Sequence, residues 1–149
     1  MSIEVLPCAG RRAYPPRVTA TTAPFWNGLA EGRFQSTYCE DCDRFTFPPK
    51  AICPHCWSRR IIWRELSGRG RLYASTVIHA APAAFQGDAP YSIAIVDLEE
   101  GVRLATRLLD KETIELDQPV KLVALCYEDG PLFAARPDIT HAGSTPDAG

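Results

Sequence analysis

Apolar and polar positions in the second half of the chain follow the pattern of extended segments. Val, Ile, Leu and aromatic residues recur there in short runs bounded by turn residues, as is typical of strands. We expect five strands, at residues 71–80, 91–98, 102–108, 120–127 and 132–135. No helix long enough for a parallel crossover separates them, so the sheet should be antiparallel or barrel-like. The pattern favours a five-stranded antiparallel OB-fold barrel over residues 67–137.

The first half of the chain has a different pattern. Residues 1–21 contain several prolines without periodic apolar spacing, which predicts a flexible arm. Residues 22–33 combine the hydroxyl of Thr22, an early proline, apolar residues on one side and a terminating Gly32, which predicts a short helix. The last residues, 138–149, are expected to form a disordered tail.

Four of the six cysteines form two CxxC pairs, Cys39 with Cys42 and Cys53 with Cys56. One tight turn aims each pair of thiolates at the same ion, and two such turns complete a tetrahedron. We therefore expect a zinc ribbon over residues 34–66, with one structural zinc ion, because four thiolates leave no open coordination position. A segment this short buries too little apolar surface to fold without metal.

Iron is the alternative ion for the same four thiolates. The second CxxC pair resembles a rubredoxin knuckle, and iron would make the chain an electron carrier. Rubredoxin-type iron knuckles usually have Gly after the second cysteine of each pair, whereas this chain has Asp43 and Trp57. A left-handed backbone is tolerable for Asp and unusual for Trp, so the sequence favours zinc and leaves the knuckle geometry open.

Composition agrees with a globular chain, since 46% of the residues are hydrophobic and 23% are charged. The longest stretch without a charged side chain, residues 72–87, is shorter than the roughly 20 apolar residues of a membrane span. The first residues also lack the apolar run of a secretory signal. We therefore expect a cytoplasmic protein with no membrane partner.

Charge is divided unequally along the chain. Residues 1–75 carry 11 Lys and Arg against 6 Asp and Glu, whereas residues 76–149 carry 5 against 12. OB-folds and zinc ribbons both serve in single-stranded nucleic-acid binding, which is a second candidate function. The acidic barrel half disfavours that function, and we expect no nucleic-acid partner.

The ordered elements resemble the DUF35 family, in which a rubredoxin-like zinc ribbon and an OB-fold are associated with acyl-CoA metabolism. The resemblance covers roughly residues 22–137. It is carried by Phe25-Trp26-Asn27-Gly28-Leu29, the two CxxC pairs, Phe47-Pro48-Pro49-Lys50, Ser67-Gly68-Arg69-Gly70, Ser75-Thr76-Val77 and the segment from Pro90 to Gly101.

The resemblance implies a function as well as a fold. Members of the family usually serve as accessory subunits or fused domains of thiolases, acyltransferases, sterol side-chain aldolases and some hydratases. It therefore implies a non-catalytic subunit of a hetero-oligomer whose ribbon docks on a thiolase-fold enzyme and whose OB-fold covers or extends the acyl-CoA site. The sequence itself contains no recognisable nucleophile motif. The alternative within the family is a stand-alone acyl-CoA-binding protein or a weak CoA-ester enzyme.

Candidate contacts with a CoA thioester follow from its chemistry. Arg and Lys side chains hold phosphates by charge-assisted hydrogen bonds. The candidates for the CoA phosphates are Lys50, Arg59, Arg60, Arg69 and Arg71. The candidates for an acyl passage or a partner interface are Phe25, Trp26, Phe45, Phe47, Trp57, Phe85 and Tyr91.

Overall fold

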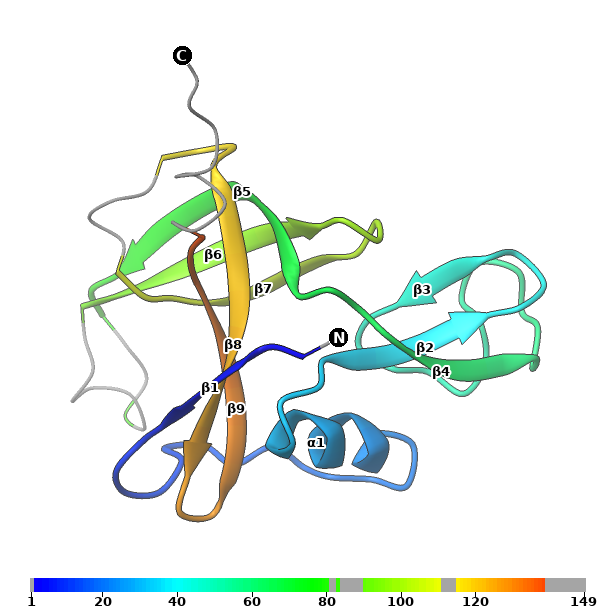
Figure 1. The fold of residues 1–149 in the computed structure, drawn as a ribbon, viewed down its shortest axis with the longest axis horizontal. Coiled ribbons are helices and arrows are strands. Elements are labelled where there is room, and N and C mark those ends of the chain that lie inside the picture. The colour runs from blue at the N-terminus through cyan, green and yellow to red at the C-terminus, as the bar shows by residue number, and fades with distance from the viewer. Residues whose placement is uncertain (1, 81–82, 84–89, 111–114, 139–149) are drawn as a thin grey trace.

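The computed structural model describes residues 2–80, 83, 90–110 and 115–138. A β-barrel and a smaller three-stranded ribbon form two lobes, and the short helix of the described residues lies beside them (Figure 1). No helix in the described part of the chain is long and apolar enough to cross a membrane. The elements are, in order, β1 (Glu4–Pro7), α1 (Ala23–Ala30), β2 (Gln35–Cys39), β3 (Arg44–Thr46), β4 (Ile61–Glu65), β5 (Arg69–Ile78), β6 (Tyr91–Leu98), β7 (Arg103–Leu108), β8 (Pro119–Tyr127) and β9 (Gly130–Pro137).

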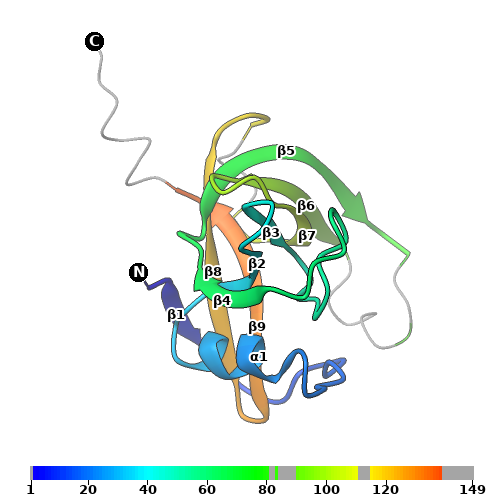
Figure 2. The same cartoon turned by 90° about the vertical axis from the view of Figure 1, so that its right-hand side faces the viewer.

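Five strands close the OB-fold barrel in the order β8-β5-β6-β7-β9, and β8 pairs with β9 to complete the ring (Figure 2). Each strand begins and ends within two residues of its expected position. Four neighbouring pairs are antiparallel, and the fifth, β7 with β9, is parallel. An odd number of strands cannot alternate in direction around a closed ring, so one parallel pair is unavoidable. The OB-fold barrel expected from the sequence is confirmed, with this parallel seam added.

The ribbon is a three-stranded antiparallel sheet with β2 in the centre, between β3 and β4. Buried hydroxyl groups tie β2 to β3, because Ser36 and Thr37 both donate hydrogen bonds to the carbonyl of Thr46. The first cysteine of the CxxC pairs, Cys39, is the last residue of β2. The sheet therefore fixes the starting point of the first knuckle.

An aromatic cluster joins the helix, the ribbon and the barrel. Phe25 of α1 is 2% exposed and lies at its centre. Its ring centroid is 5.4 Å from those of Phe34 and Phe47, and 5.9 Å from that of Phe133 in β9. Most of these contacts are edge-to-face, the geometry that the aromatic quadrupole favours. The two lobes consequently share one continuous core.

The helix is shorter than its expected range and is capped differently. The Thr22 hydroxyl caps no backbone group of α1 and instead accepts a hydrogen bond from the Thr19 amide at 2.9 Å. Gly32 ends the segment as expected, with a φ of 80° that suits glycine. The Thr22 hydroxyl, which the sequence pattern predicts to be a helix cap, therefore stabilises a turn before the helix instead.

The arm at residues 1–21 is not simply flexible, because residues 4–7 form β1. This strand runs parallel to β8, with Glu4 opposite Val123 and Pro7 opposite Cys126. Its inner side covers a small apolar cluster on the outside of the barrel, formed around Val123 and Leu125. Exposure at most positions of β1 hides this strand from pattern analysis.

Arg12 fastens the arm to the turn between β8 and β9. Its guanidinium donates to the carbonyls of Asp129, at 2.7 Å, and Pro131, at 3.1 Å, and lies 3.4 Å from the Asp129 carboxylate. The Arg12 amide also donates to that carboxylate at 2.9 Å. Gly130 makes room for this contact, since a β-carbon there would lie 2.7 Å from Cζ of Arg12.

Replacing Arg12 with Ala should release the arm and cost about 2–3 kcal/mol, because it removes hydrogen bonds from a charged, largely buried group. Hydrogen exchange at the Cys8 and Glu128 amides, which bond across the two segments, should accelerate. The exposed Arg11 provides the control, and Arg11→Ala should leave both amides protected. Equal protection in the two variants would contradict the fastening role.

The same contact should make stability depend on pH. The Arg12 amide, with help from its guanidinium, holds the pKa of Asp129 below its ordinary value. A carboxyl whose pKa is lower in the folded state stabilises the fold above its unfolded pKa of about 3.9, and that stability is lost as pH falls through the folded pKa. Because release of the arm also withdraws the backbone amide of residue 12 from Asp129, acid denaturation of Arg12→Ala should show a smaller loss over this acidic range than the wild-type chain.

Candidate functional site

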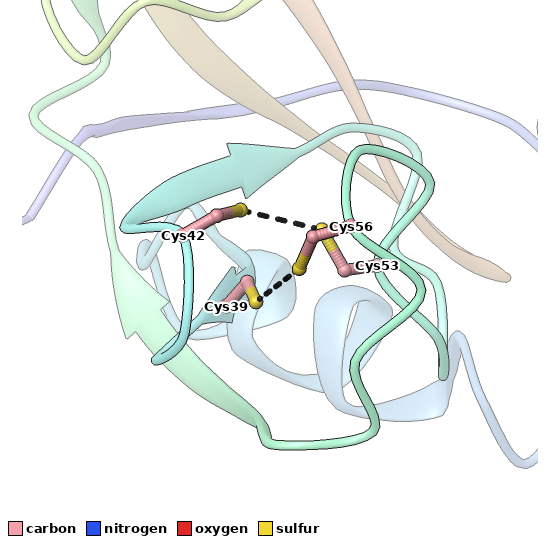
Figure 3. Close-up of side chains that lie close together, drawn as sticks. All are labelled: Cys39, Cys42, Cys53 and Cys56. Atoms are coloured by element: carbon pink, nitrogen blue, oxygen red, sulfur yellow. Dashed lines mark hydrogen bonds between the residues drawn. The ribbon is translucent and has the colours of Figure 1, made fainter.

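The four paired cysteines meet at one end of the ribbon (Figure 3). The two knuckles have the same turn, since the Asp43 amide donates to the carbonyl of Cys39 at 2.9 Å and the Trp57 amide to that of Cys53 at 2.8 Å. The second knuckle lies in the connection between β3 and β4. Two equivalent turns thus present four thiols to a common centre.

The spacing of these thiols fits a tetrahedral metal ion. The Sγ atoms of Cys39 and Cys56 are 3.6 Å apart, and so are those of Cys42 and Cys53. All four sulfurs lie within 4.8 Å of one another. A tetrahedral zinc ion with bonds of about 2.3 Å would place its sulfurs about 3.8 Å apart. The site is therefore a four-thiolate metal site without an open coordination position.

The protein environment gives the neighbouring thiols of Cys39 and Cys42 different pKa values. Burial alone would raise the pKa of Cys39, but the backbone amides of Cys42 and Asp41 bring that pKa down to about 7. Burial, with the contacts of the other thiols, raises the pKa of Cys42 to about 12. Four crowded thiols cannot all ionise in the absence of a cation. A bound dication reverses this balance, because it favours the thiolate form at each ligand.

Both knuckles adopt the left-handed backbone that their sequence left in question. Asp43 has a φ of 60° and Trp57 has a φ of 65°. Such a backbone costs roughly 1–2 kcal/mol for an ordinary L-residue. The knuckles consequently keep rubredoxin-like geometry without glycine, and this geometry by itself does not separate zinc from iron.

The five candidate cations lie in two regions. Lys50, Arg59 and Arg60 belong to the ribbon, and Arg60 is paired with Asp41 at 2.6 Å. Arg69 and Arg71 lie on β5, at the junction of ribbon and barrel. The structure therefore does not gather the five cations into one phosphate site.

Arg69 and Arg71 line a cleft of about 330 Å³, the junction cleft. Arg69 is paired with Glu99 at 3.6 Å, and Arg71 donates to the Asp117 carbonyl at 2.8 Å. The cleft also contains four acidic residues, Asp97, Glu99, Asp117 and Asp138. Carboxylates outnumber cations here, so the electrostatics of this cleft oppose a bound phosphate.

The aromatic candidates also separate. Phe25 is buried in the core, while Trp26, Phe45 and Phe47 are partly buried against it. These positions hold the lobes together, and Phe25 has no free surface for an acyl chain or a partner. Trp57 is 78% exposed on the second knuckle. Phe85 lies outside the described residues.

Tyr91 lines a second cleft on the outer side of the barrel, which we call the outer groove. Its volume is about 300 Å³, and its lining is mainly apolar. The guanidinium of Arg107 lies 4.4 Å from the Tyr91 ring centroid. The other lining residues are Ala13, Ile93, Leu125, Tyr127, Leu132 and Phe133. Sequence reasoning found only Tyr91, because pairing of β6, β7, β9 and β8 brings the others together.

Family comparisons cover both lobes. Residues 26–61 match the model of the ChsH2 rubredoxin-like zinc ribbon domain, and residues 63–125 match that of the ChsH2 C-terminal OB-fold domain. A DUF35 domain-containing scaffold protein of Pyrococcus furiosus is 34% identical over 113 residues, which span 71% of this chain and 82% of that protein. The chain belongs to the DUF35 family.

Matches to other DUF35 relatives cover different shares of the chain. A scaffold protein of Methanocaldococcus jannaschii is 43% identical over 74 residues, or 48% of this chain and 52% of that protein. This chain thus spans about half of that relative. The solved structure of an Ltp2-ChsH2(DUF35) aldolase contains a chain that is 32% identical, with a TM-score of 0.70. The match covers 83% of this chain and 98% of the other.

Two further relatives of this DUF35 chain are named as enzyme subunits. The 3-oxo-4,17-pregnadiene-20-carboxyl-CoA hydratase alpha subunit of Mycobacterium tuberculosis is 30% identical over 83% of this chain and 40% of its own length. The benzoylsuccinyl-CoA thiolase subunit BbsA of Geobacter metallireducens is 34% identical over 56% of each chain. Both names refer to CoA thioesters.

Proposed function

We propose that this DUF35 chain is a non-catalytic accessory subunit of a thiolase-like enzyme that acts on CoA thioesters. The observation that carries the proposal is the match to a chain of the Ltp2-ChsH2(DUF35) aldolase, at 32% identity over 98% of that chain. The CoA-thiolase and CoA-hydratase names of other relatives point to the same class of partner.

The metal site supports a structural contribution to such a complex. Four thiolates saturate a tetrahedral zinc ion, which therefore has no position for substrate or water. The residues that would hold the ion are Cys39, Cys42, Cys53 and Cys56. Their task is to fix the ribbon, whose strands alone form a small sheet, as a rigid unit of the subunit.

The outer groove is the site that we assign to the acyl group of the thioester. Ile93 and Leu132 offer apolar surface, and Tyr91 offers an aromatic wall. An acyl chain that leaves water for such a groove gains about 25 cal/mol per Å² of buried apolar area. No phosphate of CoA is assigned to the junction cleft, because the carboxylates there would repel it.

Isolation of the tagged chain from its native host at low salt tests the accessory function. Stoichiometric co-purification of a thiolase-fold or hydratase-fold enzyme, with about one zinc ion per chain, is the expected result. The alternative function, a stand-alone acyl-CoA-binding protein, predicts that the chain arrives alone and still binds a CoA ester in calorimetry. That second result would overturn the accessory proposal.

The groove assignment has its own test. Leu132→Trp should fill the outer groove and weaken binding of an acyl-CoA to the purified complex by at least about tenfold, while CoA without an acyl group binds as before. Tyr73→Ala, at an aromatic residue that lines the junction cleft instead, is the control. Unchanged acyl-CoA affinity in a folded, partner-bound Leu132→Trp variant would remove the acyl group from this groove.

A further inference from the structure

Trp57 combines a highly exposed side chain with a backbone conformation that suits glycine. Its side chain is 78% exposed, more than any other large apolar side chain in the described part of the molecule. Its backbone is left-handed, with a φ of 65°. Exposure leaves the indole in water, and a left-handed backbone disfavours a bulky residue. The chain therefore carries the largest side chain at a position that suits glycine.

Asp43, the equivalent residue of the first knuckle, makes a local side-chain contact that Trp57 does not make in the described part of the chain. Asp43 has nearly the same φ, 60°, but its carboxylate accepts a hydrogen bond from the Tyr38 hydroxyl at 2.9 Å. Among the described residues, no ring or cation contact involves Trp57. Strained and exposed residues of this kind cluster at functional sites, and Trp is enriched among the residues that dominate protein interfaces.

Two cations near Trp57 in the sequence indicate what covers it. Lys50 and Arg59 flank the second knuckle in the sequence, and neither has a carboxylate within ion-pair distance among the described residues. Arg60 differs, because Asp41 already engages it at 2.6 Å. Ile52, on the same loop, adds a partly exposed apolar side chain. The complementary surface is an apolar pocket with carboxylates at its rim.

We propose that Trp57 is the anchor through which this subunit docks on its partner enzyme. The indole enters an apolar pocket of the enzyme, and carboxylates at the rim of that pocket face Lys50 and Arg59. The inference rests on the proposed accessory function and names the docking residue that this function requires. The ribbon extends away from the barrel, which leaves its knuckles accessible to a second protein (Figure 1).

Trp57→Gly separates docking from folding. Glycine fits the left-handed backbone, so the variant should keep its zinc and should melt about 2–4 °C higher than the wild-type chain. Its affinity for the purified enzyme, identified by co-purification with the wild-type chain, should fall at least about tenfold. Asp43→Gly is the matched control, with the same backbone change in the other knuckle and unchanged affinity. Arg59→Glu should weaken the same complex, and more so at low salt.

Each outcome of these measurements decides the inference. Equal affinity of Trp57→Gly and wild type for the enzyme would overturn the anchor while leaving the accessory function intact. A lower melting temperature or lost zinc in Trp57→Gly would assign the indole to folding and overturn it as well. If the wild-type chain forms a dimer that Trp57→Gly dissociates, Trp57 docks on a second copy of this chain, and the proposed enzyme pocket is wrong. Absence of any enzyme partner for the wild-type chain would instead remove the proposed function and the anchor together.

Discussion

Cys39→Ser is expected to abolish metal binding and unfold the ribbon. Its Sγ lies 3.6 Å from that of Cys56, and the site needs all four sulfurs to surround one ion. Structural zinc contributes an apparent 10–16 kcal/mol, roughly, in small zinc modules, which is comparable with the whole stability of a domain. Metal analysis should give about one zinc ion per wild-type chain and almost none in the variant, and circular dichroism should show lost ribbon strands.

The damage should extend beyond the metal site into the barrel. Phe47 follows the first knuckle and its ring stacks on that of Phe34, with centroids 5.6 Å apart, beside Phe133 of β9. Loss of the ribbon therefore removes aromatic partners from the shared core. Hydrogen exchange should consequently accelerate in β9, and a chelator added to the wild-type chain should reproduce the effect.

Cys126→Ser provides the control for metal loss, because Cys126 lies on β8, outside the cluster. This variant should bind zinc as the wild-type chain does. A chelated chain whose ribbon strands persist would contradict the structural assignment of the ion. If the purified wild-type protein is red and contains iron, the ion in this site is iron instead of zinc, and the electron-carrier function becomes the better explanation.

Local patterns in the sequence predict most of the fold. In β7, for example, burial alternates at every residue, and Arg103 and Arg107 alternate with Leu104 and Leu108, so the period-two pattern appears directly in the sequence. Two CxxC turns likewise place their thiols by covalent spacing alone. These features depend on neighbours in the chain, and that is why strand positions and the cysteine cluster could be expected before the structure.

Features that depend on distant pairing could not be expected in this way. Arg12 contacts Asp129, 117 residues away, and nothing in the arm itself marks that partner. β1 is stabilised by β8, although its own side chains are mostly exposed. The bulky side chain of Trp57 disfavours a left-handed backbone, yet the metal-binding turn imposes that backbone regardless of the side chain. In each case tertiary context outweighs local preference.

Tertiary context also separates the aromatic residues that the sequence offers as site candidates. The sequence identifies an aromatic residue but not the direction of its ring, so it predicts core and exposed aromatic residues as one group. The structure turns Phe25 into the core and Trp57 toward solvent. The outer groove escaped notice because its walls come from four strands. Burial and strand pairing, rather than residue type, therefore separate core, interface and ligand positions.

Phe25→Ala should be the most damaging substitution outside the metal site. The ring is 2% exposed and contacts aromatic partners from α1, the ribbon and the barrel, so its loss leaves a cavity where three elements meet. Truncation of a buried Phe costs about 3–5 kcal/mol. The melting temperature should fall by about 6–20 °C, whereas Leu116→Ala, at a side chain that is 63% exposed, should change stability by less than about 0.5 kcal/mol.

Phe25→Ala and Cys39→Ser should have different signatures, because the aromatic cluster joins the lobes and contains none of the four metal-site cysteines. Phe25→Ala should keep about one zinc ion per chain below its melting transition, whereas Cys39→Ser should not. The distinction also tests the sequence-based prediction that Phe25 lines an acyl passage or a partner interface. If Phe25→Ala kept wild-type stability and lost affinity for an acyl-CoA, the ring would line a passage after all. A large loss of stability with zinc retained would establish it as the joint between ribbon and barrel.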